Sequence, residues 1–191
     1  MLSRRATLAA GLAALGLALG LWGIRWGLPD KAKLARVLPP GLDTPEFHQE
    51  LMNSWAAMHK RLGVNLMINP EAIVSFKGVV KTPAGWSKPP EALMSSARSF
   101  HIRSAHEDEQ TMLLMLSRLK PKKLELNPHM FTYGTIHVYA VGACLAVGAV
   151  TGMVTLQNSL MPYLAAPEKM GAMYLTGRLL TVAAYVGCAL L

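Results

Sequence analysis

Residues 131–167 read FTYGTIHVYAVGACLAVGAVTGMVTLQNSLMPYLAAP and contain no Asp, Glu, Lys or Arg. Soluble domains carry about 25% charged residues on average, so a charge-free stretch of this length is unusual for them. A transmembrane helix, in contrast, needs about 20 consecutive apolar residues to cross roughly 30 Å of hydrocarbon. The stretch therefore indicates a membrane protein, and it predicts a spanning helix at about residues 136–156.

Two further apolar tracts lie near the two ends of the chain. Residues 171–191 carry a single charge, Arg178, and residues 6–24 carry none. A short proline-containing loop separates the tract at 171–191 from the one at 136–156, which predicts a two-helix transmembrane hairpin within residues 131–191. The expected fold is an α-helical, multi-pass membrane protein with three spans.

The first tract follows Arg4 and Arg5 and has two interpretations. A basic head before an apolar stretch is typical of secretory and transit signals, and SRRATLAAG resembles a bacterial twin-arginine signal. No A-x-A cleavage pattern follows the tract. Aromatic and basic residues typical of a membrane interface come next: Trp22, Arg25 and Trp26. We therefore expect residues 1–28 to form an uncleaved signal-anchor helix.

The middle region, residues 29–130, is polar and rich in proline, and we expect an extramembrane segment that is helical or irregular. Thr44 followed by Pro45 is a typical helix start and predicts an amphipathic helix at about residues 44–62. Its apolar residues fall on one helical face: Phe47, Leu51, Trp55, Met58 and Leu62.

A second amphipathic helix is expected near residues 104–120. Ser104 and Glu107 have the spacing of a capping box, and Pro121 would end the helix. Residues 73–80 could form a short strand. Two helices and a strand give only a small core, so we expect the apolar face that contains Trp55 to require the membrane surface or another subunit.

Arg178 is the most informative single residue, because a cation inside a spanning helix costs roughly 2.5–3.5 kcal/mol at the bilayer centre. Its side chain could extend to lipid headgroups, or it could pair with a carboxylate or carbonyl of a neighbouring subunit. We therefore predict a lipid or partner contact at Arg178, as at Trp22, Arg25, Trp26 and Trp55.

Small residues recur at a spacing of four in all three tracts, which lets helix backbones approach closely. The predicted helix-packing residues are Gly16 and Gly20, Gly148 and Gly152, and Ala183 and Gly187.

The histidines give no clear metal or haem site. His101 and His106 are five residues apart, which does not match helical ligand spacing, and we expect them at a solvated helix start. His129 and His137 lie near the start of the second span, where haem ligation would need a second axial ligand at matching depth. The sequence has no G-x-S-x-G, H-E-x-x-H, P-loop or dinucleotide fingerprint, so we expect no cofactor, no metal and no enzyme activity.

The net charge of +8 comes from bases that flank the apolar tracts, as expected for contacts with anionic phospholipid such as cardiolipin rather than nucleic acid. We expect a non-catalytic accessory subunit or assembly factor of a mitochondrial inner-membrane complex, either a respiratory-chain complex or ATP synthase. A bacterial inner membrane is the alternative location. The alternative function is a small membrane transporter or a haem- or quinone-binding anchor.

Overall fold

The computed structural model describes residues 4–38, 41–42, 44–62, 91–128, 134–157 and 159–191. This part is mostly helical, and it contains no strand beyond an isolated bridge between Lys120 and Glu125. The possible strand at residues 73–80 and the side chain of His129 lie outside the described residues. The helices are α1 (Arg4–Leu21), α2 (Lys31–Val37), α3 (Pro45–Leu62), α4 (Glu91–Ile102), α5 (Glu107–Ser117), the 3-10 turn η2 (Pro121–Lys123), α6 (Thr135–Val150), α7 (Met161–Ala165) and α8 (Pro167–Leu190).

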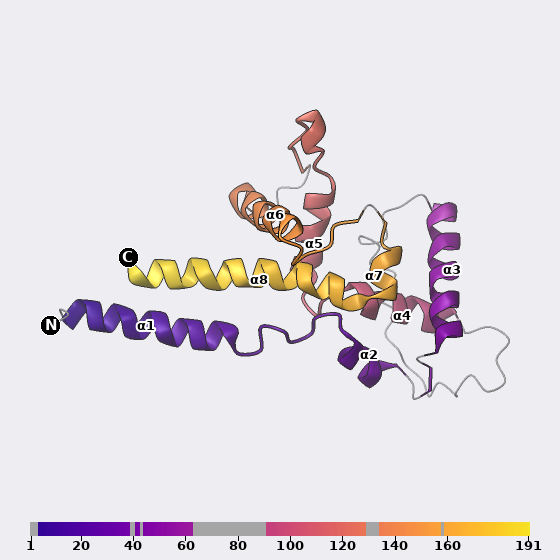
Figure 1. Cartoon of the computed structure of the whole chain (residues 1–191), viewed down its shortest axis with the longest axis horizontal. Helices are drawn as coiled ribbons and strands as arrows, with labels where there is room; N and C mark the ends of the chain where they lie inside the picture. Colours follow the sequence, from indigo (N-terminus) through magenta and orange to yellow (C-terminus); the bar gives the residue numbers. More distant parts are fainter. Residues whose placement is uncertain (1–3, 39–40, 43, 63–90, 129–133, 158) are drawn as a thin grey trace.

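A helical body occupies one end of the molecule (Figure 1). In this body α4 contacts α2, α3, α7 and α8, so segments far apart in the sequence share one core. Leu42, Leu51, Leu93, Met115 and Leu164 are among its fully buried side chains. Helices α4 and α7 thus cover the part of the predicted α3 face whose side chains are described, which holds Phe47, Leu51 and Trp55.

Helix α3 begins as predicted. The backbone N–H of Phe47 donates to the hydroxyl of Thr44 at 3.2 Å, and Pro45 is the first helical residue. Phe47, Leu51 and Trp55 are buried against the chain's own core, with Trp55 only 6% exposed. Trp55 is thus a core residue here and not an exposed contact for lipid or another subunit.

The predicted helix at residues 104–120 is shorter, and its capping box is wrong. Helix α5 runs from Glu107 to Ser117, and its N-cap is His106, which makes no side-chain capping bond. The Ser104 hydroxyl instead accepts from the backbone N–H of His106 at 3.0 Å and closes a turn between α4 and α5. His101 lies in the last turn of α4 and is fully buried, so it is not at a solvated helix start.

The predicted second span is also shorter than expected. Helix α6 ends at Val150, and Gly152 adopts a left-handed backbone conformation with φ of 77°, which terminates the helix. Gly152 is therefore a turn residue and not a helix-packing residue. Gly148 packs against the same turn, because a methyl group added at Gly148 would meet the side chain of Val154. The proline-containing loop that the sequence predicts between the second and third tracts contains the short helix α7 and the first turn of α8.

Helices α1 and α8 lie side by side and antiparallel and extend away from the body, with the two chain ends at the same end of the molecule (Figure 1). Among the described helices, α8 alone is long and apolar enough to cross a membrane; the apolar parts of α1 (Ala6–Leu21) and α6 (Ile136–Val150) are shorter. The C-terminal hairpin of α6 and α8 is not confirmed as a pair of spans. Both α1 and α6 pack against α8, and Arg178 marks the place where α8 leaves the body.

Candidate functional site

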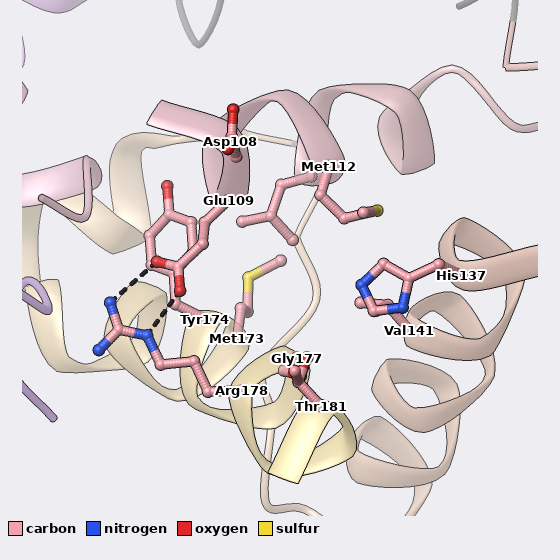
Figure 2. Close-up of a pocket in the computed structure, with 11 residues that line it drawn as sticks. Asp108, Glu109, Met112, His137, Val141, Met173, Tyr174, Gly177, Arg178 and Thr181 are labelled. Atoms are coloured by element: carbon pink, nitrogen blue, oxygen red, sulfur yellow. Dashed lines mark hydrogen bonds and ion pairs between the residues drawn. The ribbon is translucent and has the colours of Figure 1, made fainter. Parts of the chain in front are cut away.

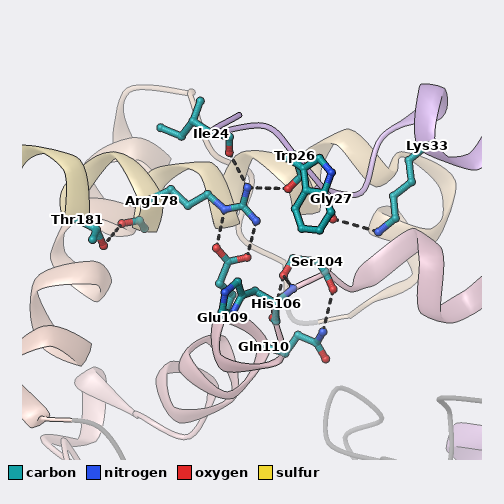
Figure 3. A network of polar contacts seen from close by, with 11 residues as sticks. Ile24, Trp26, Gly27, Lys33, Ser104, His106, Glu109, Gln110, Arg178 and Thr181 are labelled. Atoms are coloured by element: carbon teal, nitrogen blue, oxygen red, sulfur yellow. Dashed lines mark hydrogen bonds and ion pairs between the residues drawn. The ribbon is translucent and has the colours of Figure 1, made fainter. Parts of the chain in front are cut away.

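Arg178 joins three parts of the chain at the base of the α1–α8 pair. Its Nε donates to Glu109 Oε1 at 2.6 Å, and its Nη2 donates to Glu109 Oε2 at 3.0 Å (Figure 2). Its Nη1 donates to the backbone carbonyls of Ile24 at 2.6 Å and Trp26 at 2.8 Å (Figure 3). A planar guanidinium has five donors in a fixed fork, and four bonds of this set tie α8 to α5 and to the segment after α1.

The Arg178 side chain is 17% exposed and that of Glu109 is 22% exposed, so the pair is largely removed from water. The sequence prediction placed the partner of Arg178 in a headgroup or in another subunit. The partner carboxylate instead comes from α5 of the same chain, from the part that the sequence assigned outside the membrane. The acidic first turn of α5 was recognised only as a helix start, and no spacing rule links residues 69 positions apart.

A second set of contacts holds the same segment from its other side. The ammonium of Lys33 donates to the carbonyl of Gly27 at 3.1 Å (Figure 3). It also donates to the carbonyl of Arg103 at 3.2 Å. The N–H of Ala105 also donates to the Gly27 carbonyl, at 2.9 Å. Burial lowers the pKa of Lys33 below its usual value, with Asp30 acting in the opposite direction.

Gly27 is required where it stands. Its φ is +69°, and an added Cβ would overlap the Cβ of Ala105. Any larger residue would therefore have to adopt a strained backbone and displace the loop between α4 and α5. The exit of the chain from α1 is thus fixed to the body by backbone geometry and by two cations, Arg178 and Lys33.

The predicted packing glycines of α1 face α8. Gly16 is buried against the ring of Tyr185, where an added methyl group would overlap the ring, and a methyl at Gly20 would lie 2.9 Å from Val182. Ala13, one turn earlier, is also buried at 7% exposure. In contrast, Ala183 and Gly187 are exposed, and nothing lies within 4 Å of a methyl built on Gly187.

The predicted interfacial residues gather at the base of the pair. Trp22 is 86% exposed and Trp26 is 71% exposed. Arg25 between them is exposed as well. They lie in the same short segment whose carbonyls bind Arg178, so the sequence cluster and the buried cation occupy one level of the molecule.

A cavity of about 170 Å³ adjoins the ion pair, between α5, α6 and the middle of α8. Glu109, Tyr174, Arg178 and Thr181 line it together with His137, which the sequence analysis had considered as a haem or quinone ligand (Figure 2). In the view of Figure 2 the side chains of Met112 and Met173 lie between His137 and the ion pair. The His137 ring faces the cavity, while the Glu109 carboxylate is already paired with the Arg178 guanidinium.

Within the described ranges, no group of three or more His, Cys, Asp or Glu side chains is placed to hold a metal ion. Comparisons of the chain with protein-family models, with curated proteins and with solved structures found no match.

Proposed function

We propose that this protein is a non-catalytic accessory subunit or assembly factor of a membrane protein complex. In this proposal the α1–α8 pair lies in the bilayer, and the helical body lies at the membrane surface. The proposal follows from the surface of the pair, from the position of Arg178 and from the distribution of charge, which are considered in turn.

The outer surface of the α1–α8 pair is apolar and exposed to solvent in the isolated chain. Burying a leucine side chain is worth roughly 1.5–3 kcal/mol, so a stable protein does not leave many of them in water. The exposed large side chains of the pair are Leu8, Leu12, Leu15, Leu17, Leu19 and Leu21 of α1 and Leu179, Tyr185 and Leu190 of α8. Lipid chains or the apolar helices of another subunit would cover this surface.

The observation that carries the proposal is the contact of Arg178 with the carbonyls of Ile24 and Trp26. Because of this contact, the only charge of α8 after Lys169 lies level with the Trp22–Trp26 segment, where interfacial aromatic and basic residues are expected. Beyond that level α1 has 18 residues, about 27 Å at 1.5 Å per residue, close to the roughly 30 Å of a hydrocarbon core. Helix α8 continues for residues 179–190, about 18 Å, so in this arrangement α1 crosses most of the bilayer and α8 enters it part of the way. The charged residues at the far end of α1 would then lie at the opposite interface.

The choice of complex and compartment rests on the sequence. The net charge of +8 and the basic residues around the apolar tracts favour a membrane rich in anionic phospholipid such as cardiolipin. We place the protein in the mitochondrial inner membrane, in a respiratory-chain or ATP-synthase complex, with a bacterial inner membrane as the alternative. The exposed Ala183 and Gly187 give a partner helix a close approach to α8.

Membrane embedding is tested with the full chain in vesicles of phosphatidylcholine and phosphatidylglycerol. In a background with Cys144→Ser and Cys188→Ser, a cysteine at Leu15, on the exposed face of α1, should resist a membrane-impermeant maleimide until detergent is added. The matched Lys31→Cys variant, on the exposed face of α2, should react in both conditions. If the Leu15→Cys and Lys31→Cys variants were labelled at equal rates in intact vesicles, or if alkaline carbonate released the protein, an embedded α1–α8 pair would be excluded.

Membership in a complex is tested by mild detergent extraction from native membranes and native electrophoresis, followed by mass spectrometry of the band. The expected result is migration well above the 20.7 kDa chain together with other membrane subunits. Migration as the free chain would contradict the accessory role and leave the embedding test unaffected.

The second candidate is a small transporter or a haem- or quinone-binding anchor. It is favoured by one observation, the presence of His137, Glu109 and Arg178 around one cavity. An absorbance spectrum of the purified full chain reconstituted with haem discriminates the two. A Soret band that His137→Ala abolishes would support this candidate, and a spectrum of free haem would exclude haem binding.

A further inference from the structure

A second hollow lies between α5, α6, α7 and α8, on the other side of Leu113 from the ion pair. This groove has a volume of about 400 Å³, within the roughly 300–1,000 Å³ of small-molecule pockets. None of its lining residues carries a charge. Its walls are made mainly of leucine and methionine, and its polar lining residues are Ser117, Tyr139, Gln157 and Tyr163. The Ser117 hydroxyl donates to the Leu114 carbonyl at 2.8 Å.

The two tyrosine hydroxyls are also used inside the protein. Tyr163 donates to the carbonyl of Thr155 at 2.7 Å, and Tyr139 donates to the carbonyl of Leu126 at 2.9 Å. A polar ligand would therefore find little to bind within the groove, whereas a hydrocarbon chain would fill it without leaving a buried polar group unsatisfied.

A basic tip adjoins the rim of the groove. Leu119 and Pro121 line the groove, and the next two residues, Lys122 and Lys123, are exposed in the η2 turn. The tip is closed by the ion pair of Lys120 with Glu125 at 2.9 Å. The Tyr139–Leu126 bond attaches the tip to α6, so the two lysines are held close to the opening.

Leu124 is an exposed apolar residue at the end of the basic tip. It adopts a left-handed backbone conformation with φ of 57°, which glycine or asparagine would take at lower cost, and its side chain is 85% exposed. An exposed leucine beside two lysines is the pattern of a segment that enters a membrane interface. In Figure 1 the tip lies at a similar position along the long axis to the base of the α1–α8 pair.

The groove opens beside an apolar stripe on the outer face of α6. Ile136, Tyr139, Ala143, Val147 and Val150 are exposed along this helix, and Ala146 is an exposed residue of the groove wall. A hydrocarbon chain could therefore pass from the membrane into the groove without crossing a charged surface.

We propose that the groove is a lipid site that takes one acyl chain of an anionic phospholipid, with the lipid phosphate beside Lys122 and Lys123. The proposal rests on the proposed function, because it requires the body to lie against the bilayer. The basic tip favours a lipid with an anionic headgroup over one with a zwitterionic headgroup. The uncharged walls favour an acyl chain over a soluble anion. It assigns a bound lipid to the body, distinct from lipid around the α1–α8 pair.

The probe is a phosphatidylglycerol with a photoreactive diazirine in the middle of one acyl chain, incorporated with the full chain into phosphatidylcholine vesicles. Mass spectrometry should place cross-links on α5 and α6 residues of the groove wall. Ala146→Phe, which fills the groove from an exposed position, should remove these cross-links. Ala143→Phe, exposed on the same helix but outside the groove, should leave them unchanged.

The headgroup is tested by competition with unlabelled lipid. The Lys122→Gln, Lys123→Gln double variant should lose preference for phosphatidylglycerol over phosphatidylcholine by about 30-fold, the product of two basic surface contacts. The Lys31→Gln, Arg36→Gln control on α2 should keep it. Cross-linking of the groove wall that is equal in Ala146→Phe and the natural chain, or cross-links confined to α1 and to residues 177–190 of α8, would overturn the lipid site. Vesicle association in the same experiment would show that the proposed function stands.

Two other outcomes distinguish a failure of the lipid site from a failure of the proposed function. Cross-linking of the groove wall to a co-purifying subunit in native membranes, with no lipid cross-link, would assign the groove to a partner helix and reject the lipid. Failure of the full chain to associate with vesicles would reject the proposed function itself.

Discussion

Arg178 of α8 and Glu109 of α5 form a two-point ion pair, with Nε–Oε1 at 2.6 Å and Nη2–Oε2 at 3.0 Å. The same guanidinium binds two backbone carbonyls of the segment that follows α1. One side chain therefore fixes the position of the apolar pair relative to the body. The cation near the middle of α8 is thus paired within the chain where it is largely removed from water.

Replacing Arg178 should lower the stability of the folded chain by more than the partial exposure of its side chain alone suggests. Arg178→Ala removes all four bonds and leaves Glu109 without its cation, so we expect a loss of roughly 2–4 kcal/mol in stability, near the range for a broken buried pair. Arg178→Lys should recover only part, because an ammonium cannot match the planar fork. Thermal unfolding of the full chain in detergent micelles measures both, with exposed Lys169→Ala as control; equal midpoints for Arg178→Ala and Lys169→Ala would contradict the clamp.

The glycines of α1 should respond to alanine with opposite signs. Gly11 has open space around it, so Gly11→Ala should stabilise the helix by about 0.5–1 kcal/mol. Gly16→Ala should destabilise by roughly 1–3 kcal/mol, because the methyl group overlaps the Tyr185 ring. Unfolding midpoints of the two variants give the comparison, and a stabilising effect at both positions would show that α1 does not pack on α8 through this face.

Lys33 should produce a stability gain at alkaline pH. Its pKa is lowered in the folded chain, chiefly by burial, so above that lowered pKa the unfolded state binds more protons up to the usual 10.5. Stability therefore rises with pH through this window, and the neutral amine still donates to the Gly27 carbonyl. The difference in unfolding midpoint between the natural chain and Lys33→Met, measured in steps from neutral pH upward, should widen in favour of the natural chain; a constant difference would contradict the burial of Lys33.

Leu124 should behave as a residue retained for contact and not for stability. Leu124→Gly relieves the left-handed backbone and should raise stability by about 1 kcal/mol, while it weakens binding to anionic vesicles. Leu126→Gly, two residues later and without a left-handed backbone, should lower stability instead. Thermal unfolding and vesicle flotation of both variants test the pair, and unchanged flotation of Leu124→Gly would remove Leu124 from the membrane contact.

Several elements of the structure follow from local sequence signals. The start of α3 at Thr44 and Pro45 was predicted correctly, because a cap and its helix are neighbours in the sequence and need no tertiary information. Helix α4 and the burial of Trp55 were missed for the opposite reason. Helix α3 packs on α4 and α7, which are distant in the sequence. No periodicity within α3 distinguishes a face that packs in the chain's own core from a face that binds another subunit.

The apolar tracts by themselves predicted helices where α1, α6 and α8 lie, because hydrophobicity is a local property; among the described helices α8, and neither charge-free tract, is long and apolar enough to cross a membrane. Only the tertiary structure decided that α8 packs on α1 as well as on α6, and that Arg178 finds its carboxylate within the chain. Sequence neighbours usually pair in space, so the sequence favoured the C-terminal hairpin. The observed pairing depends instead on glycine-to-ring contacts and on an ion pair between residues 69 positions apart, and such matching of shapes and charges is fixed only when the whole chain has folded.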